Sequence, residues 1–160
     1  MTSTMRIAPA SFADAATQRL VEAVQEEYVV LYGSRDDSPI EEGAFDAPRG
    51  AFFLGSVDDE PVAMGGWRLR PDVLPLGATL AAEIRRMYVA PDARRRGYGH
   101  DVLAHLESTA HAAGADVMVL ETGTEQPAAI RMYEEAGYVL VEQFGHYTWS
   151  PKSRCFGKRI

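Results

Sequence analysis

The chain has 160 residues, of which 46% are apolar and 24% charged, a composition that excludes a disordered tail or a fibre and fits one globular domain over residues 1–160. Its single cysteine, Cys155, excludes an internal disulfide and a thiolate metal cluster, and we expect a reducing, cytoplasmic compartment. No apolar run approaches the ~20 residues of a membrane span, and the first residues lack the apolar stretch of a secretory signal.

The formal charge of −7 is unevenly distributed along the chain. Residues 1–60 hold twelve acids and four arginines, a net charge of −8, whereas residues 85–96 hold five arginines and one aspartate, a net charge of +4. The overall charge argues against a general nucleic-acid binder, and the basic segment indicates a local anion site for a small phosphorylated ligand. The acids of residues 36–46 would favour a cationic amine as a second ligand.

The first half of the chain predicts a helix, a loop and a hairpin. Apolar residues recur at helical spacing from Ala13 to about Tyr32, and Gly33 is expected to end that helix. Residues 33–50 are rich in glycine, proline and acids and read as a long mobile loop, which in a compact domain is more often functional than idle. The apolar segments 51–57 and 61–69 flank a polar turn and predict a β-hairpin.

The second half predicts alternating strands and helices. A strand over 79–90 is followed by a turn rich in arginine and glycine, a helix ending at Gly114, a strand at 117–121, a helix at 127–136 and extended structure at 138–144. This βαβαβ order indicates an α/β fold in which helices cover a mixed sheet. The aromatic residues near the C-terminus are expected to close the far edge of the sheet: Phe144, Tyr147, Trp149 and Phe156.

The turn Arg94-Arg95-Arg96-Gly97-Tyr98-Gly99 lies where a predicted strand leads into a predicted helix. The first amides of a helix lack intrahelical acceptors and carry partial positive charge, so such an end binds phosphate. Glycine without a Cβ lets a ligand approach the backbone closely. The alternative is a solvated arginine run with a glycine turn. The spacing matches neither the phosphate loop of nucleoside triphosphatases nor a dinucleotide fingerprint.

Arg94-x-x-Gly97-x-Gly99 matches the acetyl-CoA signature [Q/R]-x-x-G-x-[G/A], and the chain resembles the GNAT superfamily of N-acetyltransferases. The resemblance is strong over residues 79–144, where EIRRMYVAPDARRRGYG and LETGTEQPAAIRMYEEAGY look like successive family segments. It implies an α/β (α+β) fold with a mixed, mostly antiparallel sheet of six to seven strands flanked by about four helices. It also implies acetyl-CoA as cosubstrate and no metal.

The resemblance further implies a cofactor site. The pyrophosphate of CoA would lie against the backbone amides after Arg94, and the pantetheine arm would pair with the strand edge at Met87 as an added strand would. The Met87 N–H would then polarise the thioester carbonyl. Gln126 stands where the family often has asparagine, and its side-chain amide would contact the amides of the cofactor. The implied cofactor-binding residues are Met87, Tyr88, Val89, Arg94, Arg95, Arg96, Gly97, Tyr98, Gly99, His100, Gln126 and Tyr133.

Two residues are candidates for proton transfer. Tyr133 occupies the position where the family commonly carries a tyrosine that hydrogen-bonds the CoA sulfur and acts as general acid; the alternative is a tyrosine packed in the core. Glu83 matches a glutamate that serves as base in the histone-acetylating branch, and strand alternation predicts that it faces the same side as Arg85 and Met87. Its alternative role is an ion pair with Arg85 or Arg68.

The remaining polar residues favour structural roles. Glu121 is a second carboxylate candidate, but we favour a structural strand end. His100, His105 and His111 do not share a helix face, so no metal site is proposed. Cys155 has no base nearby in sequence and reads as a small apolar filler, which favours direct transfer over a covalent intermediate.

The expected function is transfer of an acetyl group from acetyl-CoA to a primary amine of a small molecule in a ternary complex. The alternatives are a non-catalytic acyl-CoA sensor and a protein or peptide N-acetyltransferase. The expected partners are acetyl-CoA and the amine, with no nucleic acid and no membrane, and the C-terminal strands are compatible with a homodimer. Four aromatic residues are candidates to line the amine site, with core packing as their alternative: Tyr28, Tyr32, Trp67 and Tyr147.

Overall fold

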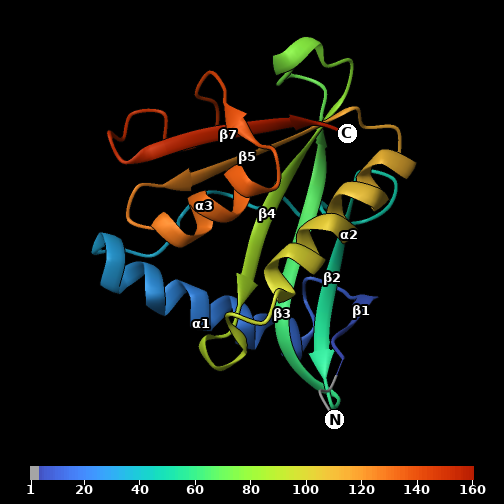
Figure 1. Ribbon diagram of the computed structural model, residues 1–160, viewed down its shortest axis with the longest axis vertical. Coiled ribbons are helices and arrows are strands. Elements are labelled where there is room, and N and C mark those ends of the chain that lie inside the picture. The colour runs from blue at the N-terminus through green and yellow to red at the C-terminus, as the bar shows by residue number, and fades with distance from the viewer. Residues whose placement is uncertain (1–3) are drawn as a thin grey trace.

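The computed structural model describes residues 4–160, which form a seven-stranded sheet in the order β1-β2-β3-β4-β5-β7-β6 (Figure 1). All neighbouring strands run antiparallel except β4 and β5, which are parallel. The strands are β1 Arg6–Pro9, β2 Gly50–Val57, β3 Glu60–Arg70, β4 Ala81–Val89, β5 Val117–Gly123, β6 Val139–Leu140 and β7 Ser153–Arg159. The helices are α1 Ala15–Tyr32, α2 Tyr98–Ala112 and α3 Pro127–Glu135, with 3₁₀ turns at Pro75–Gly77 and Pro91–Ala93.

The expected mixed, mostly antiparallel sheet is confirmed, with three α-helices in residues 4–160 where about four were expected. The helix from Ala13, the hairpin, the strand over 79–90 and the two later helices all form, with boundaries moved by a few residues. Extended structure at 138–144 is wrong for most of its length, because only Val139–Leu140 pairs with β7. The first three residues of the expected 1–160 domain lie outside the described part of the chain.

The two faces of the sheet are covered by different elements. Apolar residues of α2 and α3, including Leu106 and Tyr133, pack with the larger core cluster on one face. Leu20, Val21 and Val24 of α1 pack on the other face, at the helical spacing that the sequence showed. In Figure 1, α2 and α3 lie on the near side and the end of α1 passes behind the sheet. We call these the α2/α3 face and the α1 face.

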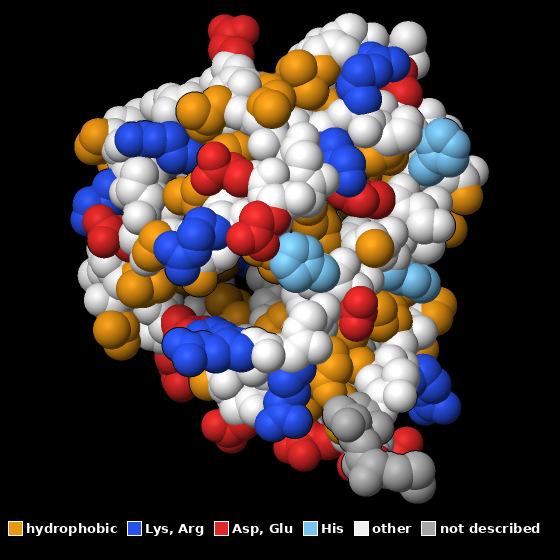
Figure 2. Space-filling model, viewed as in Figure 1, with side chains coloured by type: hydrophobic (Ala, Val, Ile, Leu, Met, Phe, Trp, Pro, Cys, Tyr) orange, Lys and Arg blue, Asp and Glu red, His pale blue; other side chains and the backbone are white. Residues whose placement is uncertain are grey.

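A cleft opens between β4 and β5. The two strands pair only from Ala81–Glu83 of β4 to Val117–Val119 of β5, and beyond these residues they diverge. Strand β5 continues to pair with β7 as far as Gly123, whereas the β5 side of β4 from residue 84 onward has no strand partner within residues 4–160. Figure 2 shows a hollow near the centre of the α2/α3 face, with basic side chains beside it.

A β-bulge interrupts β4 at Arg86, whose φ is +55°. Arg85 lies opposite Gly66 and Tyr88 opposite Met64, so two residues of β4 face one residue of β3 between these pairs. The extra residue reverses the side-chain alternation. Glu83 was expected on the same face as Met87, and this is wrong: Met87 packs in the α2/α3 core, while Glu83 bonds to arginines on the opposite face.

Candidate active site

The turn between β4 and α2 presents backbone amides at the mouth of the cleft. Arg95 and Gly97 both have positive φ, +65° and +81°, and Gly97 is the N-cap of α2. Within the described chain, the backbone hydrogen bonds of α2 begin with Asp101 N–H donating to the Gly97 carbonyl at 3.1 Å. A Cβ at Gly97 would have no heavy atom within 4 Å. The expected anion-binding residues from Arg95 to His100 are therefore together at one helix end.

Arg94 ties this turn to two other elements. Its Nε donates to the Val89 carbonyl at 2.9 Å, and its Nη2 donates to both carboxylate oxygens of Glu27 in α1, each at 2.9 Å. Its guanidinium also lies over the Tyr88 ring, 5.5 Å from the centroid. The side chain thus positions the turn, and its expected direct contact with a ligand stays a prediction.

Tyr133 and Met87, both singled out from the sequence, meet in the cleft. Tyr133 is 7% exposed, and its hydroxyl donates to Met87 Sδ at 3.8 Å. Burial, with a smaller contribution from Tyr28, raises the pKa of Tyr133 above its ordinary value. Tyr133 therefore presents a protonated hydroxyl to Met87 across the neutral pH range.

Glu83 is engaged in a buried ion-pair cluster. It is 4% exposed, and its Oε1 accepts from Arg68 Nε at 2.8 Å and from Arg70 Nη1 at 2.7 Å. The expected alternative, an ion pair with Arg68, is confirmed, with Arg70 in addition and Arg85 outside the pair. The two arginines also line a polar cavity of about 320 Å³ with Glu41, Ala44, Arg49, Leu69 and Asp72. The base role of Glu83 stays a prediction that this pairing opposes.

We expect Glu83→Gln to lower the free energy of unfolding by about 3 kcal/mol, because it leaves Arg68 without a carboxylate and Arg70 with only the exposed Asp72. For a chain of this size the melting temperature should fall by roughly 6–12 °C, which thermal unfolding measures. Asp72→Asn is the control, since Asp72 is an exposed partner of Arg70 and should cost under ~1 kcal/mol. An unchanged melting temperature with a large loss of turnover would instead favour the base role.

Glu121, which the sequence analysis assigned to a structural role, is a half-buried carboxylate that forms no ion pair within the described residues. Its Oε2 accepts from Ser153 Oγ at 3.0 Å, and the Tyr147 backbone N–H also donates to it. No basic side chain of residues 4–160 lies within 4 Å of it. Burial, reinforced by the charge of Glu83, raises its pKa despite the hydrogen bonds and Arg85. The sequence contains one indication of a special role for Glu121. The side chains of Val117 and Val119 face the protein interior, and Glu121 continues their alternation, so an acid stands where an apolar residue is expected.

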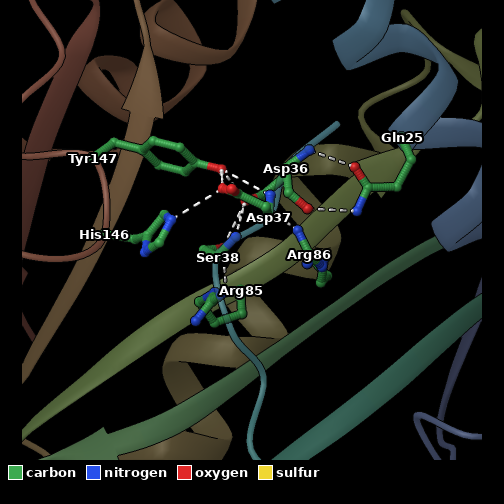
Figure 3. Close-up of polar contacts among 8 residues, drawn as sticks. All are labelled: Gln25, Asp36, Asp37, Ser38, Arg85, Arg86, His146 and Tyr147. Atoms are coloured by element: carbon green, nitrogen blue, oxygen red, sulfur yellow. Dashed lines mark hydrogen bonds and ion pairs between the residues drawn. The ribbon is translucent and has the colours of Figure 1, made fainter. Parts of the chain in front are cut away.

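The segment 36–38 of the expected mobile loop is bound on the α1 face (Figure 3). Gln25 of α1 accepts from the Asp36 amide at 2.7 Å and donates to its carbonyl at 3.0 Å. The Asp36 carboxylate pairs with Arg86 and accepts from Tyr147 Oη at 2.7 Å. Burial alone would raise the pKa of Asp36, but Arg86 and these hydrogen bonds outweigh it and lower the pKa. Sequence reasoning missed this cluster, apart from naming Tyr147.

A family model described as acetyltransferase (GNAT) family matches residues 17–138. The chain belongs to this family. An IAA acetyltransferase of Azospirillum brasilense is 38% identical to this GNAT chain over 78 residues, which are 49% of the chain and 51% of that protein. The match thus spans about half the length of that curated relative.

Solved structures share the GNAT fold over nearly the whole chain. A Klebsiella pneumoniae protein assigned as an acyl-CoA N-acyltransferase superposes with a TM-score of 0.79 at 24% identity, covering 99% of both chains. The Salmonella typhimurium protein yncA, assigned as an acetyltransferase and solved with its cofactor acetyl-CoA, gives a TM-score of 0.68 at 17% identity, covering 97% of this chain and 93% of that one. The resemblance drawn from the Arg94–Gly99 turn is confirmed at the level of family and fold.

The other residues singled out in this GNAT chain lie around the site or away from it. Gln126 precedes α3, and its amide donates to Tyr32 Oη at 3.2 Å. His105 packs edge-on against Phe53, with ring centroids 4.5 Å apart. Burial raises the pKa of Cys155 to about 11, so its thiol is protonated and a poor nucleophile at neutral pH. In the described chain, no helix is long and apolar enough to cross a membrane.

The aromatic tail does not close the sheet edge as expected. Phe156 lies in β7, but Trp149 is 75% exposed, and Tyr147 contacts Asp36 on the α1 face. Phe144 lies under the guanidinium of Arg70, 5.8 Å from ring centroid to Cζ. Segment 144–149 therefore borders the polar contacts of Asp36 with Arg86 and Tyr147 instead of extending the sheet.

Proposed function

We propose that this chain is an acetyl-CoA-dependent N-acetyltransferase that moves the acetyl group to a primary amine of a small molecule by direct transfer in a ternary complex. One observation carries the proposal: the Tyr133 hydroxyl, whose pKa is raised by burial, donates to Met87 Sδ near the end of β4 that leads into the Arg94–Gly99 turn. The acetyl-CoA bound to yncA and the acetyltransferase name of the Azospirillum relative support it.

The residues of this chain fit acetyl-CoA. The amides at the start of α2 are oriented to hold a pyrophosphate, with Arg95, Arg96, Tyr98, Gly99 and His100 around Gly97. The β4 edge at Met87, Tyr88 and Val89 lies beyond the residues that pair with β5, and a pantetheine arm would dock along it as an added strand does. When bound, acetyl-CoA supplies an acetyl group activated as a thioester.

The chain supplies the proton transfers that aminolysis of a thioester requires. The new amide C–N bond forms as the C–S bond breaks, the amine proton passes to Glu121, and the Tyr133 hydroxyl protonates the leaving thiolate. The Met87 N–H would stabilise the developing oxyanion, a contribution of ~3 kcal/mol when one such donor is well placed. We prefer Glu121 to Glu83 as proton acceptor because Glu83 is held by two arginines. The buried Cys155 thiol supports direct transfer without an acyl-enzyme.

Gly97→Val should weaken acetyl-CoA binding about five- to thirty-fold, measured by calorimetry. A β-branched residue at positive φ costs ~1–2 kcal/mol, and its methyl groups would occupy the open space in front of the α2 amides. Gly33→Val is the matched control, because Gly33 also has a positive φ, +79°, and nothing within 4 Å, but it lies at the end of α1. Equal loss of binding in both variants would contradict a phosphate site at Gly97.

The proposed activity is tested by release of free CoA from acetyl-CoA in the presence of amino acids, polyamines, aminoglycosides and peptides. We expect release with at least one small amine at rates well above hydrolysis. Tight acetyl-CoA binding without release would favour a non-catalytic sensor, and release with peptides alone would favour a peptide N-acetyltransferase. A chain that does not bind acetyl-CoA would overturn the proposal.

A further inference from the structure

The bulge of β4 places two consecutive arginines on the α1 face. Because Arg86 is the extra residue, its guanidinium and that of Arg85 both reach the segment 36–38 (Figure 3). Arg85 Nη2 donates to Ser38 Oγ at 2.7 Å, and Arg86 pairs with the Asp36 carboxylate. A regular strand would have directed the two side chains to opposite faces. The bulge thus concentrates positive charge beside the cleft.

Arg85 differs from the arginines around it in lacking a carboxylate partner. Arg68 and Arg70 share Glu83, and Arg86 holds Asp36, whereas no carboxylate oxygen in the described residues lies within 4 Å of Arg85. The guanidinium has five N–H donors, and Ser38 accepts from one nitrogen. Burial lowers the pKa of Arg85, although the charge of Glu83 opposes this. Partial burial of a cation without a counter-ion is unfavourable, and the remaining N–H donors of Arg85 are open to a ligand.

Arg86 adds an unused donor of its own. Its side chain is 7% exposed, and its Nε is buried without a hydrogen-bond partner in the described chain. Buried donors of this kind are nearly always paired in folded proteins. The two arginines thus both have hydrogen-bonding capacity that the described residues do not use.

Some of the acids of residues 36–46, which favoured a cationic amine in the sequence analysis, are already bound inside the chain. Asp36 is held by Arg86, Asp37 accepts from His146 at 3.0 Å and from Tyr147 Oη at 2.9 Å, and Glu41 pairs with Arg49 at 3.1 Å. Asp36 is therefore already paired with Arg86, while Arg85 has no carboxylate partner in the described residues. Electrostatic complementarity favours an anionic group there.

We propose that the amine acceptor carries a carboxylate, as amino acids do, and that Arg85 binds this carboxylate while the amine lies toward Glu121. The inference rests on the proposed N-acetyltransferase function and names the substrate class of that site. A guanidinium binds a carboxylate through two parallel N–H donors, which fixes the orientation of the ligand. Glu83 of β4 pairs with Val119 of β5, and Arg85 and Glu121 each lie two residues further along on the same face of the sheet. The two groups therefore suit the two ends of a small amino acid.

The test compares matched acceptors: the twenty standard amino acids, their carboxamides, and the amines that lack the carboxyl carbon. CoA release is followed at saturating acetyl-CoA in the wild-type chain, Arg85→Gln and Arg85→Lys. We expect the preferred amino acid to exceed its carboxamide by about a hundredfold in kcat/KM. Arg85→Gln should remove most of that preference through the KM for the acceptor, and Arg85→Lys should restore part of it.

Two controls separate binding from folding. Arg19→Gln removes an exposed arginine of α1 and should leave the preference unchanged. Arg85→Gln should not lower the melting temperature, because it removes a half-buried charge that has no carboxylate partner in the described residues. A lowered melting temperature with the acceptor preference intact would make Arg85 structural and overturn the inference.

The remaining outcomes are also decisive. If carboxamides and decarboxylated amines react as well as amino acids, the carboxylate is not recognised and the inference fails, while the proposed function stands. If the chain binds acetyl-CoA but none of the carboxylate-bearing probes reacts, the inference is likewise overturned. Absence of acetyl-CoA binding would instead refute the proposed function itself, and it is measured separately by calorimetry.

Discussion

Tyr133→Phe is expected to lower kcat by roughly a hundred- to ten-thousandfold while acetyl-CoA affinity changes little. This substitution removes only the hydroxyl group, and the aromatic ring of residue 133 stays packed in the core cluster of α2 and α3. Since burial raises the pKa of Tyr133, the hydroxyl remains protonated at neutral pH and is available as a donor to the leaving thiolate. Steady-state kinetics and calorimetry measure the two quantities.

Tyr138→Phe is the matched control for this variant. The Tyr138 ring centroid lies 5.7 Å from that of Tyr133, but its hydroxyl donates to Glu107 Oε2 at 2.8 Å, away from Met87. Loss of that buried hydrogen bond should lower stability by ~1–3 kcal/mol without a comparable loss of kcat. If Tyr133→Phe lost turnover and acetyl-CoA affinity equally, its hydroxyl would be a binding group, and the acid role would be abandoned.

Glu121→Gln should lower kcat about as strongly, because the amide keeps the shape and the Ser153 hydrogen bond but cannot take up the amine proton. The pH dependence gives a second readout. The pKa of Glu121 is raised above 4.5, so kcat/KM of the wild-type chain should fall as pH decreases through a midpoint above that value, and the variant should lack this acidic limb.

Glu142→Gln, which removes an exposed carboxylate after β6, should change neither the rate nor the pH profile. An acidic limb that persists in Glu121→Gln and disappears in Glu83→Gln would transfer the base role to Glu83. Because Glu83→Gln is also expected to destabilise the chain, this comparison requires temperatures well below both melting transitions.

The parts of the fold that the sequence predicted are those set by local patterns. The helical spacing of Leu20, Val21 and Val24 predicts the buried side of α1, and the Arg94–Gly99 turn is contiguous, so its chemistry is readable from six residues. Strand β1, which was not predicted, is four residues long, and its pairing with β2 depends on residues some fifty positions away. Such short edge strands carry little local pattern.

The roles of the two glutamates depend on contacts that no local pattern reveals. Glu83 is neutralised by Arg68 and Arg70 of β3, which alternation alone could only suggest as partners across the sheet. The direction of the Met87 side chain depends on the bulge at Arg86. This bulge cannot be recognised from the sequence, because arginine is not a residue type that indicates a positive φ. Glu121 is identified as available only once its surroundings at Ser153 and Tyr147 are known.

The short parallel pairing of β4 and β5 has a thermodynamic consequence. Three residue pairs join these strands before they part, so β5 leaves the remaining edge of β4 open to a ligand that docks along it. A ligand that adds itself to this edge completes the sheet and binds only the folded state, so its binding energy adds to the folding energy. The resistance of this protein to heat should therefore track the supply of its cofactor, and the free chain should be its most labile form.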